Sequence, residues 1–88
     1  MTNGHMYSVR IKRSAEKEMD NLPNSVFDRI AESILSLESD PRPQGSKKLR
    51  GLEAYRLRVG TYRILYTIDD DTQTVEIIAV GHRKDVYR

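Results

Sequence analysis

Apolar and polar residues alternate near the start of the chain and then recur at helical spacing. Tyr7, Val9 and Ile11 alternate with polar neighbours, which is the period-two pattern of a strand. Ser14 then offers an N-cap for a short helix that extends through Leu22. The pattern therefore predicts a first strand that is followed directly by a helix.

A second and longer helix is predicted from about residue 24 to residue 38. Its apolar residues recur at three- and four-residue spacing, which gathers them in one stripe that can pack on a core. Asp40, Pro41 and Pro43 end this helix, because proline lacks a donor and restricts the residue before it. The polar and basic stretch 42–53 is predicted to be a loop.

Three further strands are predicted over residues 54–59, 62–68 and 74–80. Gly60-Thr61 makes a tight turn between the first two, and residues 69–72 make another, so the three strands form an antiparallel meander. The order strand, helix, helix and three strands (β-α-α-β-β-β) indicates an α+β fold. Two N-terminal helices are expected to pack on one face of a small, mainly antiparallel twisted sheet.

Length and composition limit the classes of protein to consider. The 88 residues suffice for one domain with a thin core. Residues 1–5 look like a leader or a cloning remnant, so residues 6–88 are taken as the single domain. The absence of cysteine excludes disulfides and thiolate metal sites and fits a reducing cytoplasm. No apolar run approaches the roughly 20 residues of a membrane helix, so no membrane partner is expected.

Positive charge is concentrated in the second half of the chain, although the net charge is only +2. Between residues 14 and 40, seven acidic residues oppose two basic ones, which gives −5. Between residues 42 and 63, seven basic residues oppose Glu53 alone, which gives +6. This asymmetry predicts a face that binds a polyanion. The loop cations Lys47, Lys48 and Arg50 are candidates for RNA contacts, with plain solvated charge as the alternative.

Arginines on the predicted strands are the strongest candidates for phosphate contacts. If the odd-numbered residues of strand 54–59 pack toward the helices, Arg56 and Arg58 project together from the uncovered face. Arg63 follows across the hairpin and can join them, and Arg83 comes after the last strand. Burying such charges unpaired is costly, so they are expected to face water, a partner or a ligand.

These residue types fit the chemistry of RNA cleavage by a 2′-hydroxyl. The hydroxyl must lose a proton, the phosphoryl group gains negative charge, and the 5′-oxygen leaves with a proton. Arginine suits the second demand because it stays charged and forks onto two phosphate oxygens, and charge neutralisation is the favoured role for Arg83. His82 has an unperturbed pKa near ~6.5, which suits proton transfer, although a surface role is the alternative. Tyr87 is a base only if arginines favour its phenolate, and otherwise stacks on a base or orients the hydroxyl.

Four segments resemble the RelE/ParE superfamily of toxin–antitoxin toxins, and the resemblance spans residues 6–88. They are KLRGL at 48–52, YRLR at 55–58, GTYRILY at 60–66 and VGHRKDVY at 80–87. Within the superfamily the RelE branch is favoured. The resemblance implies a RelE-like fold and a ribosome-dependent endonuclease that cuts messenger RNA in the A site. It further implies that the ribose 2′-hydroxyl attacks the adjacent phosphate, with no metal and no cofactor.

The resemblance also implies site residues and partners. The residues that match the family's site are Arg56, Arg58, Arg63, Arg83 and Tyr87. Family members often carry lysine at the first two positions, and arginine keeps the charge but changes the donor geometry. Some members replace His82 by lysine. The implied partners are a cognate antitoxin, which covers the basic face or displaces the C-terminal segment, and the ribosome with its mRNA and rRNA.

Two other functions stay open at this point. A ParE-like protein has the same fold, inhibits DNA gyrase and cleaves no RNA. The combination of Arg63, Arg83 and Tyr87 argues against it, because gyrase inhibition does not need these residues. The remaining alternative is an RNA-binding module whose basic face holds phosphates without cutting.

Overall fold

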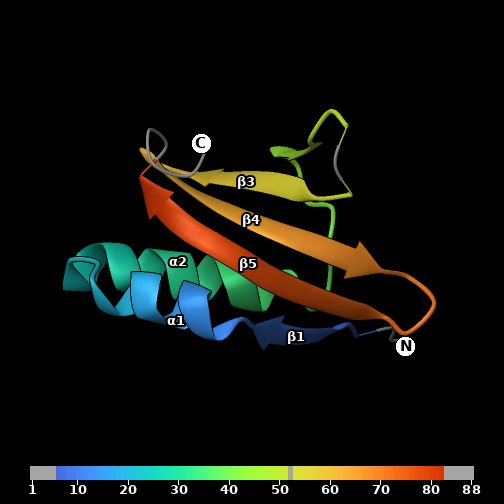
Figure 1. Ribbon diagram of the computed structural model, residues 1–88, viewed down its shortest axis with the longest axis horizontal. Coiled ribbons are helices and arrows are strands. Elements are labelled where there is room, and N and C mark those ends of the chain that lie inside the picture. Colours follow the sequence, from blue (N-terminus) through green and yellow to red (C-terminus); the bar gives the residue numbers. More distant parts are fainter. Residues whose placement is uncertain (1–5, 52, 83–88) are drawn as a thin grey trace.

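The computed structural model describes residues 6–51 and 53–82, which form two helices and a five-stranded sheet (Figure 1). Residues 1–5, which were predicted to be a leader or a cloning remnant, lie outside this part. Residues 83–88, which include the predicted site residues Arg83 and Tyr87, lie outside it as well. The elements are β1 (Ser8–Ile11), α1 (Arg13–Asp20), α2 (Asn24–Ser36), β2 (Ser46–Lys48), β3 (Tyr55–Val59), β4 (Tyr62–Asp69) and β5 (Thr74–His82). The predicted fold of two helices on a small sheet is confirmed.

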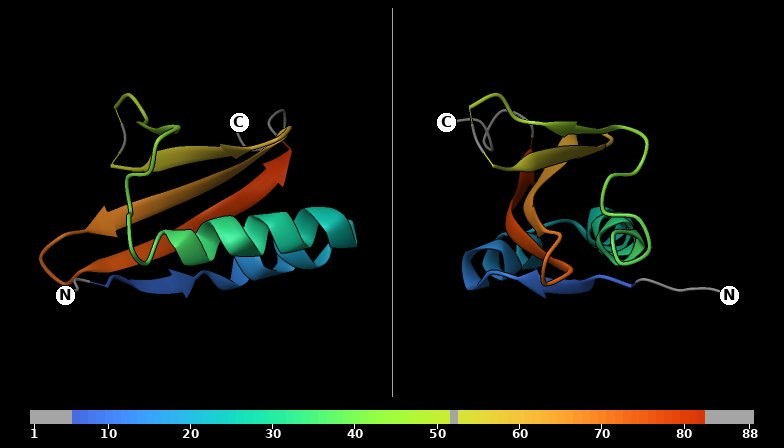
Figure 2. Two further views of the ribbon diagram at one scale, coloured as in Figure 1. Left: turned by 180° about the vertical axis from the view of Figure 1, so that it is seen from behind. Right: turned by 90° about the vertical axis from the view of Figure 1, so that its right-hand side faces the viewer.

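The strands are ordered β1-β5-β4-β3-β2 across the sheet. The meander of β3, β4 and β5 is antiparallel, as predicted, and β1 adds to β5 in parallel. The sheet is therefore mainly antiparallel, and Figure 2 shows its twist. The prediction of a loop over residues 42–53 was wrong in one part, because β2 pairs with β3 as an edge strand. Its sequence SKK has no apolar alternation, so only the backbone ladder defines it.

The first helix begins two residues earlier than the sequence indicates. Lys12, rather than Ser14, is the N-cap, and no side chain caps this helix. The backbone explains the difference, because the Lys12 N–H continues the β1–β5 pairing by donating to the Ile77 carbonyl. The Lys12 carbonyl then accepts from the N–H of Glu16 and starts the helix. Strand and helix thus meet without an intervening turn.

The core lies between the two helices and the sheet, and α1 contributes Ala15 and Met19 to it. Ile30 and Ile34 are the buried residues of α2. The sheet contributes Leu57, Ile64 and Tyr66, among others, and Tyr55 and Val59 pack against this cluster as predicted. None of the helices in the described part is long and apolar enough to cross a membrane.

Helix α1 packs beside β5 beyond the point where β1 ends. In Figure 1, β1 and α1 follow one another along the same side of β5. The backbone N–H of Val80 has no strand on that side, and it donates instead to a carboxylate oxygen of Glu18 at 2.8 Å. A side chain of α1 therefore supplies the acceptor that a further strand residue would provide.

Both turns of the meander occur where they are predicted. Gly60 has φ +62°, a left-handed conformation that glycine adopts at little cost, and it opens the two-residue turn between β3 and β4. In the turn between β4 and β5, a carboxylate oxygen of Asp69 accepts from the N–H groups of Asp71 (3.0 Å) and Thr72 (3.2 Å). An aspartate that accepts from the backbone two residues later is typical of turns.

Candidate functional site

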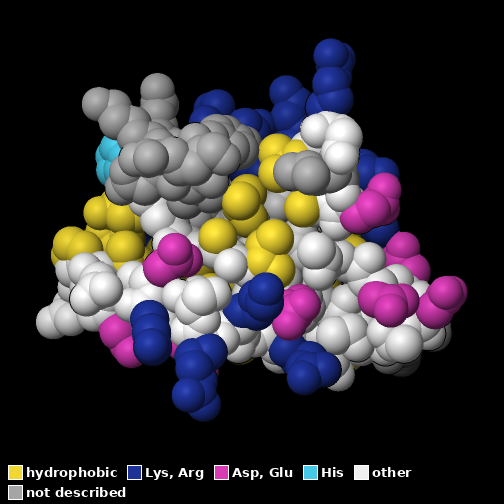
Figure 3. All heavy atoms as spheres, in the orientation of Figure 1, with side chains coloured by type: hydrophobic (Ala, Val, Ile, Leu, Met, Phe, Trp, Pro, Cys, Tyr) yellow, Lys and Arg dark blue, Asp and Glu magenta, His cyan; other side chains and the backbone are white. Residues whose placement is uncertain are grey.

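Cations from three strands share the sheet face that α2 does not cover. Arg58 on β3 lies opposite Arg63 on β4, and Lys47 on β2 lies opposite Arg56 on β3. Directly paired residues of antiparallel strands share a face, and residues two apart on one strand also share it. Lys47, Arg56, Arg58 and Arg63 therefore define one basic surface, which we call the open face. In Figure 3, Lys and Arg side chains gather along the top of the molecule, over β2 and β3.

The arginines of the open face differ in their exposure. Arg58 is exposed, because β2 begins with Ser46 opposite Leu57 and so leaves Arg58 with a strand on one side only. Arg63 is only 7% exposed, which differs from the expectation that it faces outward. It lies in the central strand, with Arg58 opposite it on β3 and Gly81 opposite it on β5. Neighbours on both flanks lower its exposure.

A hollow of about 410 Å³ lies where β2 leaves β3. Its lining consists of Gln44, Gly45, Ser46, Lys47, Arg56, Leu57 and Arg58. Arg58 therefore borders this hollow and also faces Arg63 across the strands. An anion in the hollow would meet three cationic side chains from two strands.

The structure separates the three predicted loop cations. Lys47 joins the open face, but Lys48 is the next residue on the strand and points to the other side. The ammonium group of Lys48 lies 3.6 Å from a carboxylate oxygen of Glu53, in an exposed ion pair. Arg50 is exposed in the turn after β2. Of the three, only Lys47 is brought together with the strand arginines.

His82 lies on the opposite side of the sheet from Arg63. It pairs with Tyr62, the neighbour of Arg63 on β4, and alternation places these two pairs on different faces. The rings of Tyr62 and His82 meet edge to face with centroids 5.5 Å apart. The structure therefore does not bring His82 together with the arginines of the open face. Arg83 and Tyr87 lie outside the described residues.

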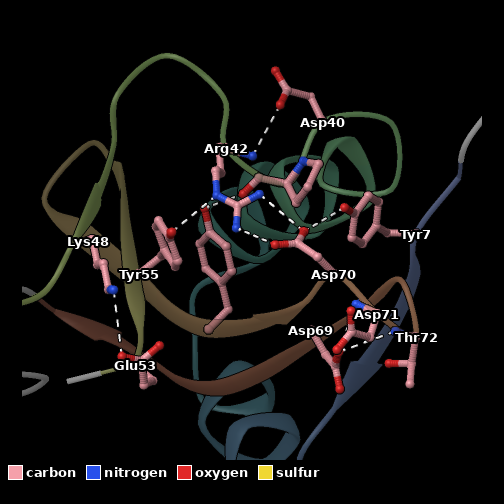
Figure 4. A network of polar contacts seen from close by, with 12 residues as sticks. Tyr7, Asp40, Arg42, Lys48, Glu53, Tyr55, Asp69, Asp70, Asp71 and Thr72 are labelled. Atoms are coloured by element: carbon pink, nitrogen blue, oxygen red, sulfur yellow. Dashed lines mark hydrogen bonds and ion pairs between the residues drawn. The ribbon is translucent and has the colours of Figure 1, made fainter.

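A network around Arg42, which sequence reasoning did not single out, holds the segment between α2 and β2 (Figure 4). The Arg42 guanidinium forks onto Asp70, with Nη2–Oδ2 at 2.9 Å and Nη1–Oδ1 at 3.3 Å. Its Nε donates to the hydroxyl of Tyr55 at 3.1 Å, and the Tyr7 hydroxyl donates to Asp70 at 2.7 Å. We call these four residues the Arg42 network. They join the residue before β1, strand β3, the α2–β2 segment and the β4–β5 turn.

The charges of the Arg42 network shift one another's proton affinities. Hydrogen bonds from Arg42, and then from Tyr7, hold the pKa of Asp70 below its ordinary value. The hydrogen bond to Asp70 raises the pKa of Tyr7, and the same carboxylate raises that of Arg42. Arg42 contributed to the positive charge counted in the sequence, but its contacts are internal. No spacing in the sequence links residues 42 and 70, so only the folded chain identifies the pair.

Tyr66 also holds the segment between α2 and β2. Its hydroxyl donates to the carbonyl of Pro41 at 2.9 Å, and its side chain is fully buried. The rings of Tyr55 and Tyr66 stack with centroids 5.9 Å apart, and Arg42 lies over the Tyr55 ring at 5.2 Å. Burial raises the pKa of Tyr66, so its phenol remains a donor well above neutral pH.

Comparison with known proteins gives one consistent group. Residues 9–87 match the family described as the ParE toxin of the type II toxin–antitoxin system, parDE. Toxin RelG of Mycobacterium tuberculosis is 37% identical over 84 residues, which cover 93% of this chain and 97% of that protein. The mRNA interferase toxin RelE of Escherichia coli is 30% identical over 86 residues, which cover 92% of this chain and 90% of that protein.

A solved structure matches along nearly the whole fold. The toxin–antitoxin complex RelBE2 of Mycobacterium tuberculosis contains a chain with a TM-score of 0.80 and 34% identity. The match covers 89% of this chain and 99% of that one. The fold is therefore shared with a chain of a solved toxin–antitoxin complex.

Proposed function

Because the chain belongs to the ParE toxin family of type II toxin–antitoxin systems, we propose that it is a ribosome-dependent mRNA endonuclease of the RelE type. It cuts message in the ribosomal A site and so inhibits translation. The relative named mRNA interferase toxin RelE supports this activity, and so do the relatives named RelG and RelE in Mycobacterium tuberculosis.

One observation carries the proposal, namely the two cross-strand cation pairs on the open face. Arg58 faces Arg63, and Lys47 faces Arg56. Like charges directly opposite each other destabilise a sheet, and an anion bound between them removes the repulsion. A nucleic-acid backbone supplies such anions at every nucleotide. A phosphate bound at either pair would therefore lie between two cationic side chains from neighbouring strands.

The proposed reaction uses the strand arginines as charge stabilisers. The 2′-hydroxyl loses its proton and its oxygen forms a bond to phosphorus, while the bond from phosphorus to the 5′-oxygen breaks and that oxygen takes up a proton. Arg58 and Arg63 neutralise the charge that develops on the phosphoryl oxygens. The low exposure of Arg63 strengthens its effect, because electrostatic interactions grow as water is excluded.

The proton carriers are proposed from the C-terminal residues. Gly81 lies opposite Arg63, so Arg83 and Tyr87 follow in sequence from the end of β5 that is next to the arginines. Tyr87 takes the role of base or of an orienting group, and Arg83 adds charge or protonates the leaving oxygen. His82 receives no part in the reaction, because its side chain belongs to the other sheet face.

The proposed partners are a cognate antitoxin and the ribosome with its message and rRNA. Structures of related toxins contain RelB antitoxins, as in the archaeal RelE–RelB complex of Pyrococcus horikoshii. We propose that the antitoxin of this chain covers the open face and so competes with RNA for the same cations. Co-purification with a cognate antitoxin tests the partner, and weaker co-purification of the Arg58→Ala, Arg63→Ala double variant tests the face.

A second candidate function is inhibition of DNA gyrase without RNA cleavage. The matching family is described by its ParE toxin, which is the observation that favours it. The two functions differ in what the protein must contact. Primer extension on translated message detects cleavage, and a supercoiling assay detects gyrase inhibition. Cuts phased with codons and present only with ribosomes support the endonuclease, whereas intact message with blocked supercoiling refutes it.

Variants of the open face test the roles of individual arginines. Arg63→Ala and Arg58→Ala are expected to slow cutting by about 10²–10³-fold each, which is the usual cost of losing one preorganised stabiliser. Arg13→Ala removes an arginine at the start of α1 and serves as the matched control. Thermal melting of each variant separates lost chemistry from lost folding. Near-normal cutting by the Arg58, Arg63 double variant would refute the site assignment.

A further inference from the structure

The segment that leads from α2 into β2 is held in a fixed shape. Residue 41 is anchored by Tyr66, and residue 42 is the centre of the Arg42 network. The N–H of Ser46 donates to the Pro43 carbonyl at 2.9 Å, and Gly45 has φ +97°, a conformation that suits glycine. Gln44 lies within this turn. Its backbone is therefore positioned by contacts on both sides.

Gln44 contributes the one side-chain amide to the lining of the 410 Å³ hollow. The residue is exposed, and within the described part of the chain its amide makes no hydrogen bond. The charged residues of the same lining are Lys47, Arg56 and Arg58. An amide on a positioned backbone, beside a group of cations, offers a ligand two different kinds of contact.

The hollow also lies in line with the proposed site of cleavage. Arg58 faces Arg63 on one side and lines the hollow on the other. An RNA strand whose scissile phosphate lies between Arg58 and Arg63 therefore extends its neighbouring nucleotide toward the hollow. Phosphate contacts position a nucleic acid, while contacts to base edges specify its sequence.

We propose that the hollow binds the nucleotide next to the scissile phosphodiester and that Gln44 contacts its base. This inference rests on the proposed function. The cations of the lining hold the phosphate, and the amide of Gln44 reads the base. One side-chain amide provides an acceptor and a donor side by side, which matches the N6 amino group and N7 of adenine. Bases of single-stranded RNA present these edges to proteins. Gln44 is thus a residue that sets a preference for adenine beside the cut.

The test uses translated messages in which the codon positions around the cut are randomised, and it maps every cut by primer extension or sequencing. The wild-type protein is expected to favour adenine at one position next to the cut by about fivefold or more, the discrimination typical of a bidentate base contact. Gln44→Ala is expected to reduce this enrichment toward the frequencies of the library. Asn24→Ala removes another exposed amide, outside the lining of the hollow, and is expected to keep the wild-type preference.

The results separate this inference from the function on which it rests. If the wild-type protein cuts no translated message, the endonuclease proposal fails first. If the wild-type protein cuts and Gln44→Ala keeps the same base frequencies, the endonuclease stands and the role of Gln44 is refuted. A variant that cuts less but with unchanged frequencies also refutes it, because Gln44 would then support the site without contacting a base. Melting curves of both variants confirm that each is folded.

Discussion

Replacing Tyr66 by phenylalanine isolates one buried hydrogen bond. The change removes the hydroxyl that donates to the Pro41 carbonyl at 2.9 Å and keeps the ring that stacks on Tyr55. A buried hydrogen bond contributes about 0.5–1.5 kcal/mol net, and an acceptor left without its donor adds to the cost, so we expect a loss of about 1.5 kcal/mol. For a domain of this size, that loss lowers the melting temperature by about 6–12 °C.

The assay is urea and thermal unfolding of Tyr66→Phe beside Tyr62→Phe. Tyr62 lies on the same strand and is half-buried, and its hydroxyl makes no hydrogen bond within the described residues. Its variant is expected to change the free energy of unfolding by less than about 0.5 kcal/mol. Equal stability losses in the two variants would show that the Pro41 contact does not hold the segment before β2.

Three further predictions concern the stability of the protein at acid pH, the turn at Gly60 and the flank of β5. Because contacts with Arg42 hold the folded-state pKa of Asp70 below its unfolded value near ~3.9, they stabilise the fold above about pH 4 and lose that contribution as pH falls. Asp70→Asn should therefore flatten the acid side of a stability-versus-pH curve. Gly60→Ala should lower the free energy of unfolding by about 1–2 kcal/mol, since φ is +62° there; an unchanged urea midpoint would contradict this. Glu18→Ala should cost about 1–2 kcal/mol by leaving the Val80 N–H without its acceptor, and Glu18→Gln, which keeps an oxygen, should restore part of it.

The strands and helices that bury apolar residues were predictable from periodicity. The meander follows from the alternation in 54–80 together with the Gly60 and Asp69 turns. Edge strand β2 was not predictable, since three polar residues carry no hydrophobic period and only backbone pairing with β3 defines them. The predicted start of α1 differs from the observed one because the backbone pairing of Lys12 with β5 sets where the helix begins. That pairing joins segments that lie far apart in the sequence.

The sequence predicted that the strand arginines share one sheet face, but it did not predict the exposure or the orientation of each candidate residue. Alternation alone placed Arg56 and Arg58 on one face, and the register of the hairpin was needed to set Arg63 opposite Arg58. Neither the 7% exposure of Arg63 nor the opposite orientation of His82 follows from composition. The exposure of Arg63 depends on the two strands that flank it, and the orientation of His82 depends on its pairing with Tyr62 across the sheet.

The strand that ends the sheet on one side is only three residues long, and two of them are lysines. A bare sheet edge invites a strand from another molecule and so promotes aggregation, while short length and lysine side chains discourage that addition. We therefore expect Lys47 and Lys48 to hinder the edge-to-edge association of identical chains. Exchanging both for apolar residues would be expected to turn this flank into a seed for fibres, independently of any effect on ligands.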